Sequence, residues 1–158
     1  PLVLAIMNGH VDVAKMLLEW ADADADQCDR AGDIPLHHAL RTGLIDIFPL
    51  LLARTRNVNK QNEQGSTPLM LAIRYGHVEV AKTLLSQISN VDQVNDSRNS
   101  ALHFAADLGQ IDIVTLILTK TDRINVPNLE GKTPPMIAEE QGHLDVVQFF
   151  SDWAKPIY

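Results

Sequence analysis

Alternating aspartates in the stretch "ADADADQCD" (residues 21–29) have the spacing of the first ligands in a calcium-binding loop. Such a loop also needs a glycine at its sixth position and a bidentate glutamate at its twelfth. Counted from Asp22, these positions hold Gln27 and Asp33, so the sharp turn and the bidentate ligand are both missing. We therefore favour an acidic link whose aspartates pair with arginines of the neighbouring link and hold no metal; calcium binding and simple solvation of the carboxylates are the alternatives.

Histidines and a single cysteine are the other groups that could ligate a metal or act in catalysis. His10, His77 and His143 each follow a glycine at a nearly regular spacing. Equivalent residues of helices stacked about 8–10 Å apart cannot share a zinc ion, whose ligands lie about 2 Å from it. Cys28 lies among aspartates, whereas a nucleophilic cysteine needs electropositive surroundings. No residue has the partners of a catalytic triad, so we predict no catalytic residue, no metal and no cofactor.

Composition narrows the classes of function further. The 158 residues carry 13 basic and 20 acidic side chains, a net charge of −7. Because binding to a phosphate backbone needs clustered Lys and Arg, we predict no nucleic-acid partner. No apolar run approaches the roughly 20 residues of a membrane-spanning helix, so we predict no membrane insertion. The lone cysteine, Cys28, fits a reducing compartment, and we expect a cytoplasmic location, with the nucleus or a host-cell cytosol as alternatives.

A repeat of 33 or 34 residues organises the whole chain. Five segments align, each with alanine at its fifth position and glycine at its ninth: "PLVLAIMNGH" (1–10), "PLHHALRTGL" (35–44), "PLMLAIRYGH" (68–77), "ALHFAADLGQ" (101–110) and "PPMIAEEQGH" (134–143). After each glycine comes an apolar pattern of helical period. Each repeat therefore predicts a short helix, a glycine turn and a second short helix, followed by a polar hairpin-like loop.

Helices of about nine residues are too short to be stable alone, so the repeats must stack. The prediction is an all-α solenoid forming one domain over 1–158, with an incomplete repeat at 1–28, repeats at 29–61, 62–94 and 95–127, and a C-terminal cap at 128–158. Because the chain starts within a repeat, we expect it to be part of a longer protein.

Local departures from the repeat predict local differences in structure. Pro49 falls inside the second outer helix and should remove a hydrogen bond or bend that helix. Arg98 replaces a glycine of the hairpin turn, which puts that hairpin's geometry in question. In the link between the first two repeats, we expect Asp22 or Asp24 to face Arg56, with Arg54 of the neighbouring link close by.

The segment "GSTPLMLAIRYGHVEVAKTLL" (65–85) resembles an ankyrin repeat, with the T-P-L pattern and the G-H turn, and the resemblance recurs along the chain. It implies a non-enzymatic module that binds a protein or peptide through the concave surface of its inner helices and hairpins. It also implies that His37 and His103 hydrogen-bond to the hairpin backbone. We expect the segment to be monomeric. Two alternatives stay open: a targeting or autoinhibitory arm of a larger enzyme, channel or bacterial effector, and metal-dependent chemistry within the segment.

The resemblance also implies where a partner would bind, namely at the residues before each glycine turn and at the hairpin tips. Those expected to contact a partner are Met7, Arg41, Thr42, Glu63, Arg74, Tyr75, Asp96, Asp107, Leu108, Glu140 and Gln141. We expect an acidic part of the partner over Arg41 and Arg74 and an apolar anchor near Tyr75 and Leu108; the alternative is a solvated face. Asn59, after Val58, matches a position that is hydroxylated in some ankyrin repeats.

Overall fold

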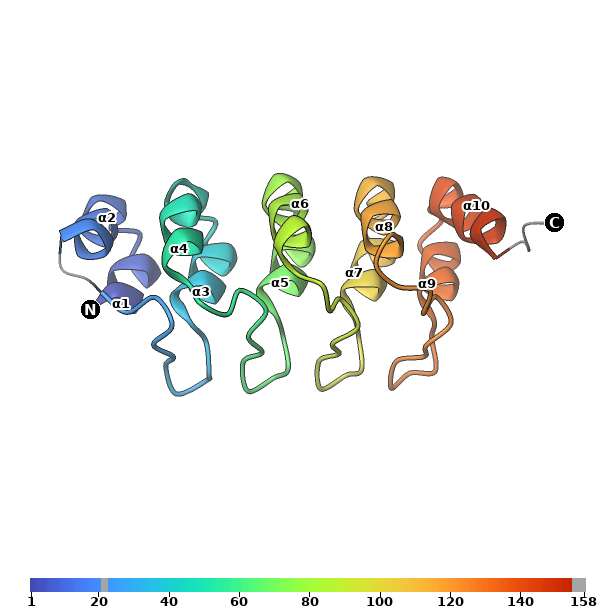
Figure 1. The fold of residues 1–158 in the computed structure, drawn as a ribbon. Coiled ribbons are helices and arrows are strands. Elements are labelled where there is room, and N and C mark those ends of the chain that lie inside the picture. The colour runs from blue at the N-terminus through green and yellow to red at the C-terminus, as the bar shows by residue number, and fades with distance from the viewer. Residues whose placement is uncertain (21–22, 155–158) are drawn as a thin grey trace. The chain divides into compact units, whose positions relative to one another are not determined.

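Each repeat folds into two short helices in the computed structural model, which describes residues 1–20 and 23–154, and hairpin-like loops join one pair of helices to the next (Figure 1). The elements found in these residues are α1 (Leu2–Met7), α2 (Val11–Trp20), α3 (Pro35–Thr42), the 3-10 helix η1 (Ile45–Ile47), α4 (Phe48–Arg54), α5 (Pro68–Arg74), α6 (Val78–Gln87), α7 (Ala101–Asp107), α8 (Ile111–Leu118), α9 (Pro134–Glu140) and α10 (Leu144–Trp153). The predicted all-α repeat fold is confirmed.

The helices are grouped into two compact units, Pro1–Ile88 and Ser89–Tyr158. In the first unit, α1, α3 and α5 pack side by side as the inner layer, α2 packs against α4, and α6 covers α5. In the second unit, α7 packs against α9, and α8 and α10 cover these two inner helices. Each unit is thus a two-layered stack in which neighbouring repeats bury one another's apolar faces.

Small residues allow the two layers to approach closely. The alanine at the fifth position of each repeat is buried: Ala5, Ala39, Ala72, Ala105 and Ala138. Apolar side chains of the outer helices, such as Leu51 and Leu84 in the first unit, are fully buried beside them. The periodic apolar pattern therefore marks the core, and it leaves the ends of the inner helices and the hairpins to solvent.

Pro49 divides the second outer helix. Residues 45–47 form η1, and α4 begins at Phe48 with Pro49 in its first turn, where the missing N–H has no partner to lose. The prediction that Pro49 lies inside a continuous helix is therefore wrong, because the chain starts a new helix at the proline and avoids the lost hydrogen bond.

The hairpins all use one hydrogen-bonding scheme, in which an Asp or Asn side chain accepts two backbone N–H groups further along the loop. Asn95, for example, accepts from Ser97 and Asn99 at 3.1 and 2.9 Å. The backbone N–H of Arg98 donates to the carbonyl of Asn95 at 2.7 Å, as Gly131 donates to Asn128. Arg98 reaches this geometry by adopting a left-handed φ of 59°, so its hairpin keeps the shape of the others.

The acidic link between the first two repeats pairs differently from the prediction. The Asp26 carboxylate accepts the backbone N–H of Arg56 at 3.1 Å, and the Arg56 side chain lies 3.9 Å away and is 90% exposed. Asp24 instead accepts the N–H of Asp26, which closes a local turn, and Asp22 lies outside the described residues. Within the described residues, the aspartate of this link that faces Arg56 is Asp26 rather than Asp24, because the turn at Asp24 directs that side chain back to its own loop.

Candidate functional site

The structure leaves all the residues predicted to contact a partner at the surface. Met7, Tyr75 and Leu108, the apolar ones, are 53%, 44% and 43% exposed. The first unit carries Met7, Arg41, Thr42, Glu63, Arg74 and Tyr75, and the second carries Asp96, Asp107, Leu108, Glu140 and Gln141. The two arginines expected to contact an acidic part of the partner thus both lie in the first unit. The two residues expected to contact an apolar anchor, Tyr75 and Leu108, lie one in each unit.

Arg41 is engaged within the chain. Its Nη1 donates to the Asp33 carboxylate at 2.8 Å, and the Asp33 side chain is only 4% exposed. This hydrogen bond, together with the nearby Tyr75 hydroxyl, raises the pKa of Arg41. The guanidinium therefore offers a partner little uncompensated charge, which the sequence reading did not anticipate.

Asp33 is the centre of this arrangement. Its second oxygen accepts from Asn62 Nδ2 at 2.7 Å, across to the next hairpin. Burial raises the pKa of Asp33, but the hydrogen bonds from Arg41 and Asn62 and the charge of Arg41 outweigh burial, and the pKa is lowered. Asp33 is therefore ionised at neutral pH and links two hairpins to helix α3.

Arg74, one repeat later, has no such partner. The residue eight positions earlier is Ser66 rather than an aspartate, and no hydrogen bond or ion pair to the Arg74 side chain occurs within the described chain. Its neighbour Tyr75 is half exposed. The first unit thus presents an arginine with no ion-pair partner in the described residues, followed directly in sequence by a half-exposed tyrosine.

The second unit repeats the same spacing with opposite charges. Lys132 and Glu140 are eight residues apart, as Asp33 and Arg41 are, and their side chains lie 2.6 Å apart. Asp107 accepts from Gln141 Nε2 at 2.8 Å. The C-terminal part of the predicted contact row is therefore acidic, and the nearby Lys132 is already paired with Glu140.

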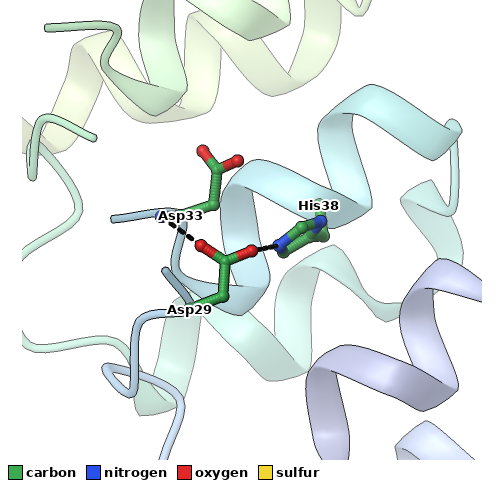
Figure 2. Close-up of side chains that lie close together, drawn as sticks. All are labelled: Asp29, Asp33 and His38. Carbon is green, nitrogen blue, oxygen red and sulfur yellow. Dashed lines mark hydrogen bonds and ion pairs between the residues drawn. The ribbon is translucent and has the colours of Figure 1, made fainter. Parts of the chain in front are cut away.

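Asp29, Asp33 and His38 are the group in the described residues that comes closest to a metal site (Figure 2). His38 Nε2 and Asp29 Oδ2 are 2.8 Å apart, and Asp29 Oδ1 accepts the N–H groups of Ala31 and Asp33. Burial raises the pKa of Asp29, but the hydrogen bond from His38 and those from the two backbone amides outweigh it and lower the pKa.

This group does not suit a cation. In Figure 2 the Asp33 carboxylate is directed away from the hydrogen bond between Asp29 and His38. All four carboxylate oxygens already accept hydrogen bonds, two of them from the side chains of Arg41 and Asn62. A guanidinium within hydrogen-bonding distance also repels a metal ion. His38, the histidine without a regular place in the repeats, is thus a structural partner of the hairpin.

Two of the three regularly spaced histidines, His77 and His143, join neighbouring repeats. The Nε2 atoms of His77 and His143 each lie 2.9 Å from a backbone carbonyl of the preceding inner helix, at Leu40 and Asp107. His37 accepts the N–H of Ile34 through Nδ1 and lies 3.1 Å from the Ser66 carbonyl through Nε2. Asn59 is half-buried, with its N–H bonded to Asn57, and its hydroxylation stays a prediction.

Comparison with known families agrees with this architecture. A family model described as ankyrin repeats (3 copies) matches residues 2–96, 43–128 and 87–155. No curated protein matches the chain. Among the described residues, no helix combines the length and the apolar character needed to cross a membrane.

Proposed function

Because this chain belongs to the ankyrin repeat family, whose members are generally protein-interaction modules, we propose that it binds a protein or peptide partner through its inner helices and hairpins. We propose that it does so without enzymatic activity of its own and as a monomer. The family is commonly intracellular, and we place its action in the cytoplasm.

The observation that carries this proposal is the pair Arg74 and Tyr75 at the end of α5. Arginine and tyrosine are enriched among the residues that dominate binding energy at interfaces. The Tyr75 ring is 44% exposed, and the Arg74 guanidinium has no ion-pair partner among the described residues. Arg41, in contrast, is already paired with Asp33 of the same chain. We therefore assign the acidic part of the partner to Arg74 rather than to both arginines.

The proposal is tested by selecting binding peptides from a phage-displayed library on the purified chain and measuring their affinities by fluorescence anisotropy. The double variant Arg74→Glu with Tyr75→Ala should weaken binding at least about tenfold, since loss of a hot-spot side chain costs roughly 2 kcal/mol. The matched control is Arg56→Glu with Trp20→Ala, an exposed arginine and an exposed aromatic outside the inner helices and hairpins. Unchanged affinity of a folded Arg74/Tyr75 variant rejects this site.

A further inference from the structure

A groove of about 220 Å³ lies between α7 and α9 of the second unit and extends to the hairpins that precede these helices. Pockets for drug-sized ligands occupy about 300–1,000 Å³, so this groove has room for one long side chain rather than for a whole small molecule. Its lining includes His103, Phe104, Asp107, Lys132, Ile137 and Glu140. We call this surface the acidic groove.

Negative charge dominates the lining of the acidic groove. Asp107, Glu130 and Glu140 contribute three carboxylates against the single ammonium of Lys132, which leaves two negative charges uncompensated. Lys132 lies 2.6 Å from Glu140 and 3.6 Å from Glu130, and its hydrogen bond to Glu140 raises its pKa. The cation is therefore fully occupied by the groove's own acids.

Carboxylate oxygens of Asp107 and Glu140 in the acidic groove have unused capacity. Asp107 accepts from Gln141 through Oδ1, and Glu140 accepts from Lys132 through Oε2. Within the described part of the chain, Asp107 Oδ2 and Glu140 Oε1 accept no hydrogen bond. Cationic donors are the groups that satisfy such oxygens best, because charge-assisted hydrogen bonds are about twice as strong as neutral ones.

Within the part of the chain that the structure describes, His103 adds a buried polar atom without a hydrogen-bond partner to the lining of the acidic groove. The residue is 2% exposed, and its Nδ1 accepts the N–H of Ser100, which leaves the proton on Nε2. The carbonyls of Lys132 and Val126 lie near His103, yet among the described residues Nε2 has no hydrogen-bond partner of good geometry, unlike His37 in the first unit. Burial lowers the pKa of His103, so the neutral ring brings no cation to the groove.

We propose that the acidic groove receives an arginine side chain of an extended partner segment. The planar guanidinium can donate to Asp107 and Glu140 together and can stack on the half-buried Phe104 ring, which a lysine ammonium does less well. The methylenes of the arginine would lie along Ile137, which also lines the groove. This inference rests on the proposed function and names the partner's chemistry at one part of the binding surface.

The test is a phage-displayed peptide selection on three proteins: the wild type, the variant Asp107→Asn with Glu140→Gln, and the control Asp122→Asn with Glu139→Gln. Each double variant removes two exposed acidic charges from the second unit, but Asp122 and Glu139 do not line the acidic groove. Arginine-containing peptides should be enriched on the wild type and on the control and lost on the groove variant. Replacing the selected arginine by citrulline, its neutral isostere, should weaken binding roughly 10- to 100-fold.

The outcomes separate this inference from the proposed function. Selected peptides that lack arginine, or that bind the groove variant as tightly as the wild type, would overturn the arginine site and leave the interaction function intact. A citrulline peptide that binds as tightly as its arginine parent would overturn it as well, without any change to the protein. Failure of the wild type to select any peptide would refute both proposals.

Discussion

Replacing Asp33 by asparagine isolates the charge that ties the first unit's hairpins to its inner helix. The substitution keeps the shape of the side chain and one oxygen acceptor, but it removes the negative charge. In the wild type, Asp33 accepts from Arg41 at 2.8 Å and from Asn62 at 2.7 Å. In the variant, the new amide NH₂ must face one of these donors, so one of the two hydrogen bonds is lost.

The size of the expected loss in the free energy of unfolding depends on how deeply these groups are buried. A hydrogen bond to a charged group contributes about 1.5–3 kcal/mol, more than one between neutral groups. The Asp33 side chain is 4% exposed, which favours the upper end, but Arg41 is 36% exposed and water screens its charge. We expect Asp33→Asn to lower the free energy of unfolding by about 2 kcal/mol at neutral pH, a large part of the roughly 5–15 kcal/mol that stabilises a domain.

The loss should depend on pH in a defined direction. Because the pKa of Asp33 in the folded protein is lowered from the ordinary value of 3.8, its carboxylate contributes full stability above that value. The contribution is lost as the pH falls through the lowered folded pKa, where Asp33 takes up a proton. The difference between wild type and variant should therefore be constant from neutral pH down to about 4 and should shrink below it.

Urea unfolding followed by far-UV circular dichroism measures this difference at each pH. The control is Asp46→Asn, an exposed aspartate of the same unit, for which we expect a change within about 0.5 kcal/mol. A change at Asp33 no larger than that of the control would refute the assigned contribution of the Arg41 and Asn62 contacts. A difference that persists unchanged in acid would refute the pKa argument.

Two further substitutions test the backbone of the turns by the same assay. Arg98→Gly should stabilise the protein by about 1 kcal/mol, because glycine adopts the left-handed φ of 59° without the cost that a side chain incurs. A loss of stability would show that the arginine side chain makes contacts that outweigh this cost. Gly109→Ala should lower the free energy of unfolding by about 1–3 kcal/mol more than Gly76→Ala does. Both glycines have positive φ, but of the two only a Cβ at position 109 would meet His143, at 2.5 Å from Nδ1. Equal losses of stability would mean that the His143 ring moves aside freely.

The surface predicted from the repeat register was only partly informative about the candidate site. The resemblance to ankyrin repeats implies that the residues before each glycine turn face a partner, and Tyr75, Leu108 and Met7 are exposed there. It did not distinguish Arg41 from Arg74, although one is paired and the other has no ion-pair partner in the described residues. A sign of this was available in the residue eight positions earlier, which is Asp33 for Arg41 and Ser66 for Arg74. The eight-residue spacing predicts an ion pair only if the hairpin is known to fold back onto the end of the inner helix.

The two candidate metal sites likewise differ in whether the sequence pattern alone could exclude them. The aspartate run of residues 21–29 lacks the glycine and glutamate of a calcium loop, and this could be read directly. The cluster of Asp29, Asp33 and His38 could not be evaluated in this way, because its carboxylate oxygens are occupied by Arg41 and Asn62 from other segments.

The sequence by itself determined the repeat period, the all-helical fold and the buried alanines, because these depend on periodic patterns within about 33 residues that recur along the chain. Only the tertiary structure decided which charges are neutralised internally and which are free for a partner. Lys132 is occupied by Glu130 and Glu140, and Asp33 by Arg41 and Asn62, through contacts that join hairpins to helices and to one another. Such pairings depend on side-chain distances of a few ångströms, which the repeat pattern does not specify.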